Sequence, residues 1–180
     1  MHNIVNSAVQ PPTQAAQPQP PAVKNEATPK AKNEDSNSKL AAALIKLASN
    51  AFQLYIQSHL IHLNYEGEDF LAMHKFLKKE YEQHTEAFDK LSEYVRSLDF
   101  MMPMCHKGLL SACKSMKMVD SYSGRSMLLT YLRNLEEFGF QCKGGINIAR
   151  KANAPDIENY LSELVGDSFT SAWKIKATLR

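Results

Sequence analysis

Apolar residues recur every three or four positions in four long stretches of the chain, the spacing typical of amphipathic helices. The first stretch starts after Asn37 or Ser38, and either side chain can cap a helix. The second stretch spans about residues 68–98, the third 125–152, and the fourth begins near Pro155. The pattern predicts an all-α protein with four long helices. Its expected core positions are Leu40, Leu44, Leu47, Ala51, Leu54, Ser58 and Ile61, then Phe70, Leu77, Tyr81, Phe88, Leu91, Val95 and Leu98, then Leu128, Leu129, Leu132, Leu135, Phe138 and Ile146, and finally Ile157, Leu161, Leu164, Phe169, Trp173 and Ile175.

The connections between these stretches indicate how the helices are arranged. Gly67 is the strong turn residue between the first two, so we expect a tight reversal and two antiparallel helices. Residues 100–123 form a connection that is too long for a tight turn, and the run GLLSACKSM within it predicts a short helix. Such a crossover lets the third helix run parallel to the second, whereas short loops throughout would give an up-down bundle. The loop length favours the crossover.

Two adjacent glycines, Gly144 and Gly145, interrupt the third stretch. A glycine in the middle of a helix costs roughly 1 kcal/mol relative to alanine, so its presence indicates either close helix packing or a local bend. The sequence leaves both alternatives open.

The N-terminal segment, residues 1–37, differs from the rest because it holds six of the eight prolines and almost no large apolar residues. Such a segment cannot offset its ordering entropy by burial, so we expect a disordered arm ahead of a helical domain at 38–180. Its lysines are candidate DNA contacts, although neighbouring carboxylates offset their charge. A solvated linker is the alternative. The lysines are Lys24, Lys30 and Lys32.

Composition limits the class of protein. The 180 residues are 44% hydrophobic, enough for one core, and the net charge of +2 is too small to identify a nucleic-acid-binding domain by itself. Cys105, Cys113 and Cys142 form no paired pattern, so we expect small buried thiols and a reducing, cytoplasmic location, with the nucleoid as the site if DNA is bound. We expect no membrane span and no signal peptide.

Four side chains in the first two helices have the types and spacing of metal ligands: His62, His74, Asp89 and Glu93. His62 lies five residues before Gly67 and His74 seven after it, so the two imidazoles can face each other across the helical hairpin. Asp89 and Glu93 are four residues apart, on one helix face. However, Asp89 is fifteen residues beyond His74, roughly 22 Å along a helix. We therefore expect two half-sites that meet only when a second copy packs antiparallel across a two-fold axis.

The runs HLNYEGEDFLAMH and DKLSE resemble the signature of the Dps proteins (DNA-binding proteins from starved cells, the mini-ferritins), in which two histidines twelve apart precede an Asp and a Glu four apart. The C-terminal run DIENYLSELVGDSFTSAWKIKATL is similar to the last helix of that family. The resemblance covers about Ser38 to Arg180. It implies a ferritin-like four-helix subunit that assembles from two-fold dimers into a hollow dodecamer, possessing ferroxidase activity and protecting against peroxide.

The resemblance also assigns roles to the four side chains. It implies that His62, His74, Asp89 and Glu93 bind iron (Fe²⁺/Fe³⁺), and that Glu93 bridges two irons. Imidazole and carboxylate are ligands that suit Fe(II). No Glu stands three residues before any His, so we do not expect the intra-bundle di-iron centre of larger ferritin-like proteins.

The chain departs from the family pattern at two positions. Leu63 stands where the family usually has Trp, and Lys78 stands where it usually has an Asp ligand. An ammonium at that position repels a second cation, so we expect a weakened or single-iron site. His59, one turn before His62, is a candidate substitute ligand or a support for the ligands; simple packing is its alternative. A second hypothesis is therefore a Dps-derived shell or interaction protein with a degraded site.

Overall fold

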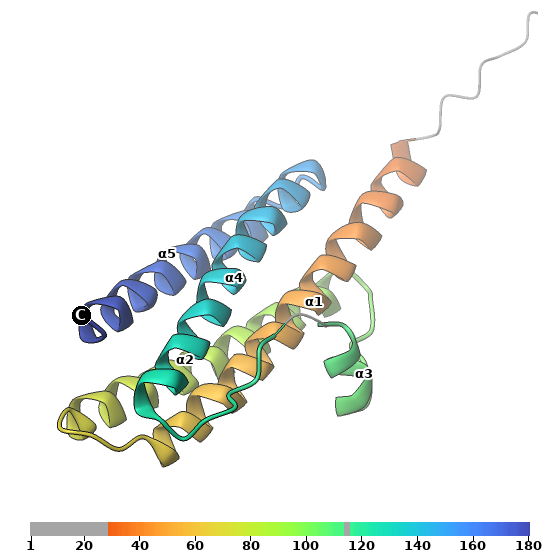
Figure 1. Cartoon of the computed structure of the whole chain (residues 1–180). Coiled ribbons are helices and arrows are strands. Elements are labelled where there is room, and N and C mark those ends of the chain that lie inside the picture. The colour runs from red at the N-terminus through yellow and green to blue at the C-terminus, as the bar shows by residue number, and fades with distance from the viewer. Residues whose placement is uncertain (1–28, 114–115) are drawn as a thin grey trace, which may run out of the picture.

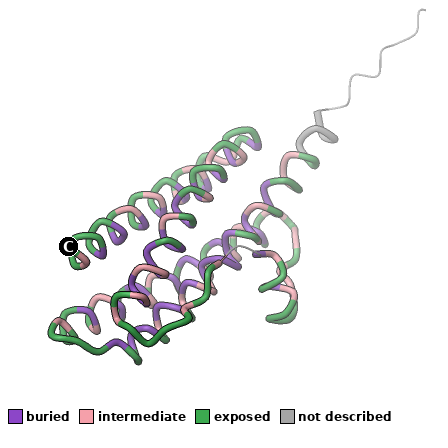
Figure 2. Tube along the Cα trace, viewed as in Figure 1, coloured by how far each residue is buried: buried purple, intermediate pink, exposed green. Residues whose placement is uncertain are grey.

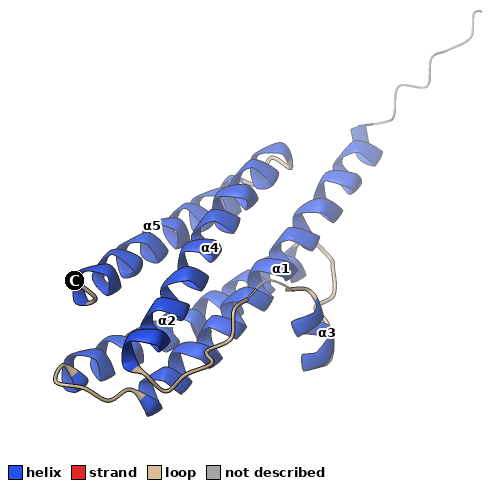
Figure 3. Cartoon of the chain, in the orientation of Figure 1, coloured by secondary structure: helices blue, strands red, loops and turns tan. Residues whose placement is uncertain are grey.

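The computed structural model describes residues 29–113 and 116–180, which form helices and loops without a strand (Figure 3). Four long helices are present: α1 (Pro29–Asn64), α2 (Phe70–Ser97), α4 (Gly124–Lys151) and α5 (Pro155–Thr178). A short helix, α3 (His106–Ser111), lies in the long crossover between α2 and α4. The predicted all-α bundle with a helix in its crossover is confirmed.

The helices pack as two hairpins. α1 lies along α2, α4 lies along α5, and α1 also packs against α4, while α3 contacts α1 from outside the bundle (Figure 1). Buried positions recur along each long helix, and α3 is mostly exposed (Figure 2). The core includes Leu44, Leu54, Leu77, Leu91 and Leu161, all fully buried. Spacing thus predicted most of the core positions of the bundle.

The start of α4 shows why α2 and α4 run parallel. Gly124, the first residue of α4, lies against the turn between α1 and α2, where a Cβ atom would stand 2.9 Å from the Tyr65 ring and 3.2 Å from the Glu66 carbonyl oxygen. α2 begins at this same turn. The crossover therefore carries the chain back to the end of the bundle from which α2 started, as its length predicted.

The structure decides between the two alternatives for Gly144 and Gly145, close helix packing or a local bend. A Cβ on Gly145 would stand 3.0 Å from Cδ1 of Leu161 and 3.2 Å from Cδ1 of Leu47, whereas a Cβ on Gly144 would meet nothing within 4 Å. α4 continues as a helix through both. Close packing of α4 against α1 and α5 at Gly145 is therefore the correct alternative.

The predicted start of the first helix is wrong, because α1 begins at Pro29 and not after Asn37 or Ser38. The extra turns are polar, so they lack the apolar spacing from which the start was inferred. Proline is compatible with the first turn of a helix. Lys39 and Asp35, which are four residues apart, form an exposed ion pair of 2.6 Å that stabilises the helix. Residues 1–28 lie outside the described residues, and with them the prediction for Lys24; the side chains of Lys30 and Lys32 are likewise not described.

Three further expectations about burial are wrong, those for Phe70, Trp173 and Cys105. Phe70, the first residue of α2, is 37% exposed. Trp173 of α5 is 66% exposed in the single chain. Cys113 and Cys142 are buried, but Cys105 is exposed, since it stands at the start of α3 with Sγ 3.4 Å from the backbone N–H of Gly108. All three cysteines are in the described part of the chain and are free thiols. None of the described helices is long and apolar enough to cross a membrane.

Candidate metal centre

The turn between α1 and α2 brings the two histidines together. Gly67 has φ +153°, a backbone conformation that side chains rarely allow, and the Tyr65 hydroxyl donates to Oδ1 of Asp69 over 2.8 Å across the turn. Burial and the Asp69 carboxylate raise the pKa of Tyr65 to about 12, so the phenol keeps its proton. His62 lies in the last turn of α1 and His74 in the second turn of α2. The short closed turn therefore places these two side chains opposite each other.

The two imidazole rings are stacked, with centroids 3.7 Å apart and planes 22° apart. Nδ1 of His62 is 2.8 Å from the backbone oxygen of His74, and Nδ1 of His74 is 3.0 Å from the backbone oxygen of His62. A carbonyl oxygen only accepts, so each Nδ1 must carry the proton. In the neutral rings, both Nε2 atoms then keep a free lone pair, which is the form that binds a metal ion.

The carboxylates lie elsewhere on the subunit. Asp89 and Glu93 are exposed on a later part of α2, roughly 22 Å beyond His74 at 1.5 Å per residue. Glu93 accepts an ion pair from Lys90 over 3.2 Å. Within the described part of the chain, no three His, Cys, Asp or Glu side chains converge on one point that could hold a metal ion. The histidine pair and the carboxylate pair are therefore separate on one chain.

Lys78 and His59 border the histidine pair. Lys78 is on the same face of α2 as His74, one turn later, with Nζ exposed and 3.9 Å from Oε1 of Glu82. His59 is half-buried on α1, and its ring lies 6.0 Å from that of His62 and stacks on Tyr81 at 4.3 Å. The Lys78 ammonium is thus exposed one helical turn after His74, and the His59 ring packs on Tyr81.

Residues 41–180 match the family model described as the ferritin-like domain. The chain belongs to the ferritin-like family. No curated protein matches the chain. Among solved structures, this ferritin-like chain is similar to the Dps protein of Vibrio cholerae, with a TM-score of 0.76, 20% identity, and 88% of this chain and 100% of that chain covered. That protein is described as a member of a broad superfamily of ferritin-like diiron-carboxylate proteins.

Two further structures have the same fold. The antigen TpF1 of Treponema pallidum gives a TM-score of 0.77 at 19% identity, covering 86% of this chain and 99% of that one. Dps of Thermosynechococcus elongatus gives 0.78 at 17% identity, covering 82% and 94%. The sequence resemblance to Dps proteins is thus confirmed at the level of the fold.

The ferritin-like bundle also contains a buried polar network that sequence analysis missed in part. Glu80, only 3% exposed, accepts from the Tyr131 hydroxyl at 3.0 Å and from the Ser171 hydroxyl at 2.7 Å. Nε2 of His84 is 2.8 Å from the same Tyr131 oxygen, so His84 donates to the phenol and the phenol donates to the carboxylate. His84 is thus a buried core residue. Glu80 was detectable too, since it falls on the apolar seam between Leu77 and His84.

Burial sets the protonation of this network. It raises the pKa of Glu80, which has no ion-pair partner in the described residues, although the two hydroxyl donors act in the opposite direction. It lowers the pKa of His84 to about 3, so the imidazole is neutral near pH 7. Burial and the Glu80 carboxylate also raise the pKa of Tyr131. The network joins α2, α4 and α5 at the centre of the bundle.

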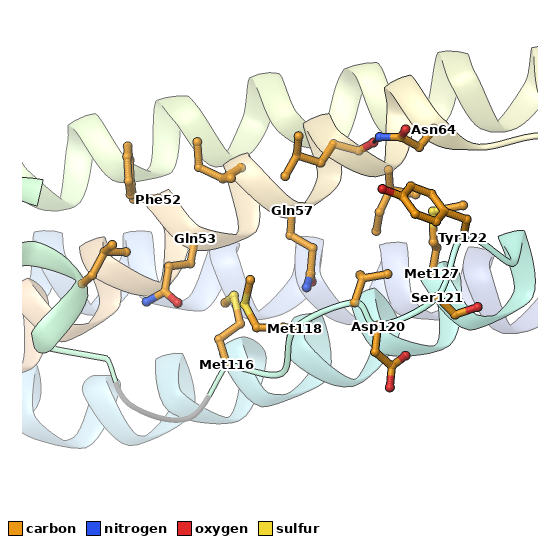
Figure 4. A pocket seen from close by; sticks show the side chains of 15 residues that line it. Phe52, Gln53, Gln57, Asn64, Met116, Met118, Asp120, Ser121, Tyr122 and Met127 are labelled. Carbon is orange, nitrogen blue, oxygen red and sulfur yellow. Dashed lines mark hydrogen bonds between the residues drawn. The ribbon is translucent and has the colours of Figure 1, made fainter. Parts of the chain in front are cut away.

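An apolar groove of about 580 Å³ lies between the outer face of α1 and the crossover (Figure 4). Gln57 fixes the crossover to α1 by donating to the Lys117 carbonyl over 2.9 Å, and Asn134 of α4 accepts from the Lys117 backbone N–H over 2.9 Å. The groove continues toward the exposed Leu60, which is 54% exposed, and it ends close to the turn that carries the histidines. In the described part of the chain, an apolar face therefore stays exposed near the end of α1 that carries His62.

Proposed function

We propose that this protein is a Dps-like mini-ferritin whose substrate is Fe(II). His62 and His74 of one subunit and Asp89 and Glu93 of a second subunit hold the iron while peroxide or oxygen oxidises it, and ferric iron is stored inside the shell. The stacked histidine pair carries this proposal. The pair presents two nitrogen donors side by side before any metal binds. A histidine that only packs in the core or lies on the surface does not require this arrangement.

The donor set fits iron. Both Nε2 lone pairs are free because the Nδ1 protons are bound to backbone carbonyls. The two ring centroids are 3.7 Å apart, so the two donors lie side by side. Imidazole and carboxylate together suit Fe(II). Our proposal assigns the bridging position to Glu93, which must first leave its ion pair with Lys90.

A second subunit completes the site. The half-sites lie far apart on one chain, and the face beside the histidines is apolar, with Leu60 54% and Leu63 64% exposed. Burying apolar area contributes about 25 cal/mol per Å², so an uncovered face of this kind favours association with a second copy. A two-fold contact supplies each histidine pair with the partner's carboxylates and makes two equal sites. We propose that six such dimers form the dodecamer typical of the Dps fold.

Lys78 limits the site to one iron at a time. Its ammonium stands one helical turn from His74 and is paired only at 3.9 Å with the exposed Glu82, so its charge is available to repel a second cation. The His59 ring lies 6.0 Å from the His62 ring, so His59 is a candidate to support or replace a metal ligand. The same lysine favours the second candidate function, a shell or interaction protein whose oxidation site is degraded.

Stopped-flow absorbance separates these two functions. Fe(II) is bound anaerobically to the assembled protein and mixed with peroxide or oxygen, and ferric absorbance is recorded. The proposal predicts oxidation well above that of a His62→Ala, Glu93→Ala shell, with Glu163→Ala, at an exposed carboxylate of α5, as a matched surface control. If the wild-type protein oxidises iron no faster than the double variant, the shell without oxidation is the correct function.

DNA binding is a further proposal that rests on the lysines of the N-terminal segment, Lys24, Lys30 and Lys32. Binding through phosphates falls steeply with salt, so the decisive assay is retardation of DNA by the full-length shell near ~0.15 M salt. Retardation that is lost when the three lysines are replaced by glutamine supports the proposal. Failure of the full-length shell to shift DNA rejects it. We propose the cytoplasm as the location of this activity, as the cysteine pattern of the sequence leads us to expect.

A further inference from the structure

Tyr81 lies directly against the histidine side of the candidate metal centre. Its ring stacks on His59 with centroids 4.3 Å apart, and it meets the His62 ring edge-on at 5.3 Å and 78°. It is half-buried and stands seven residues after His74, on the same face of α2 as His74 and Lys78. Among the ring contacts of the described residues, Tyr81 is the tyrosine that touches His62.

The electron count of the proposed reaction raises a difficulty at this site. Peroxide needs two electrons to become two waters, and each Fe(II) supplies one. With Lys78 excluding a second cation, a single bound Fe(II) would split peroxide into hydroxide and a hydroxyl radical. A protective protein needs a second electron at the moment when the O–O bond breaks, and it must come from a side chain near the iron.

We propose that Tyr81 supplies this second electron, an inference that rests on the proposed function. In the first half-reaction Fe²⁺ + H₂O₂ + Tyr–OH + H⁺ gives Fe³⁺ + 2 H₂O + Tyr–O•. The O–O bond breaks, iron and the phenol each lose one electron, and the protons come from the phenol and from solvent. In the second, the next Fe²⁺ reduces the radical: Tyr–O• + Fe²⁺ + H⁺ gives Tyr–OH + Fe³⁺.

Tyr81 thereby lets a one-iron site use a two-electron oxidant, consuming two Fe(II) ions in succession. The alternatives on this chain are placed less well. Tyr55 reaches the site only through His59, whose ring is 5.9 Å away, and Tyr65 donates its hydroxyl proton to Asp69 and makes no ring contact with the histidine pair. Tyr81 combines an oxidisable ring with direct contact to a candidate ligand.

Freeze-quench electron paramagnetic resonance tests this assignment. The assembled protein is loaded anaerobically with one Fe(II) per site and mixed with one equivalent of peroxide. We expect a tyrosyl radical in the wild type that disappears when a second equivalent of Fe(II) is added. Tyr81→Phe should lose the radical and should release hydroxyl radical to a spin trap. Tyr94→Phe, on the same helix but paired with Tyr160, should behave as the wild type.

Circular dichroism, shell size and anaerobic Fe(II) binding confirm that Tyr81→Phe is folded and loaded, since the substitution removes only a hydroxyl. A radical that persists in Tyr81→Phe overturns the assignment. So does a wild-type shell that oxidises iron without any radical. A wild-type shell that oxidises no iron refutes the proposed function itself, and the two failures are therefore distinguishable.

Discussion

Replacing Tyr131 by Phe is expected to destabilise the subunit strongly although it removes a single oxygen. The Tyr131 side chain is fully buried, and its hydroxyl lies between Nε2 of His84 at 2.8 Å and Oε2 of Glu80 at 3.0 Å. Without it, a buried N–H and a buried carboxylate oxygen each lose a partner that water cannot replace. Removing one partner of a buried pair costs about 1–3 kcal/mol for each orphaned group, and more when the group is charged.

The expected loss from the two orphaned groups is therefore about 2–6 kcal/mol. For a chain of this size each kcal/mol shifts Tm by roughly 2–4 °C, so Tm should fall by roughly 10 °C. Thermal and denaturant unfolding, followed by circular dichroism at one fixed protein concentration, measure the change, because assembly makes stability depend on concentration.

Tyr160→Phe is the matched control for Tyr131→Phe. Tyr160 is only partly buried, beside Tyr94, and its hydroxyl makes no hydrogen bond to the described residues. It should change stability by less than about 0.5 kcal/mol, as surface substitutions usually do. If Tyr131→Phe changes the free energy of unfolding as little as Tyr160→Phe does, the Tyr131 hydroxyl does not stabilise this network and the argument is refuted.

Three further predictions concern charge and packing. Because burial lowers the pKa of His84 to about 3, the folded state binds fewer protons than the unfolded chain between pH 6.5 and 3. The contribution of His84 to stability is therefore fully present above its ordinary pKa of 6.5 and is lost as pH falls toward 3. His84→Gln should flatten this part of the pH dependence of the free energy of unfolding, measured by urea unfolding. Gly144→Ala should stabilise the subunit by about 1 kcal/mol. Gly145→Ala should destabilise it by about 1–3 kcal/mol, because the added methyl group would press on Leu161 and Leu47. Equal unfolding midpoints for the two variants would contradict the packing described for α4. Lys78→Asp replaces the repelling charge by a ligand, so anaerobic titration calorimetry should show a second Fe(II) per site, and an unchanged stoichiometry would mean that the ammonium does not limit binding.

Most of the bundle could be predicted because its helices bury a regular seam. Residues such as Leu77, Leu91 and Leu161 carry the period of the helix and are fully buried. The start of α1 could not be inferred in this way, because its first turns are polar and none of their described residues before Leu40 is buried. Glu80 was missed for a related reason: a charged residue is normally solvated, and only the hydroxyls of Tyr131 and Ser171, distant in sequence, make its burial tolerable.

The candidate metal centre was predictable in composition but only partly in geometry. Spacing around Gly67 placed His62 opposite His74, and the structure brings the two rings together. Spacing could not reveal that each ring donates to the other's backbone carbonyl, which fixes both tautomers. The contact of Tyr81 with His62 was also hidden, since the apolar pattern assigned Tyr81 to the core alone.

Complementation between two defective chains tests most directly whether the site is shared between subunits. One variant carries His62→Ala and His74→Ala, the other Asp89→Ala and Glu93→Ala, and the two are assembled separately or together in equal amounts. Each heterodimer restores one intact site of two, so random pairing predicts roughly a quarter of the wild-type iron oxidation rate, while each variant alone is inactive. Co-assembled shells that stay as inactive as the separate variants would contradict a site built from the histidines of one subunit and the carboxylates of the next.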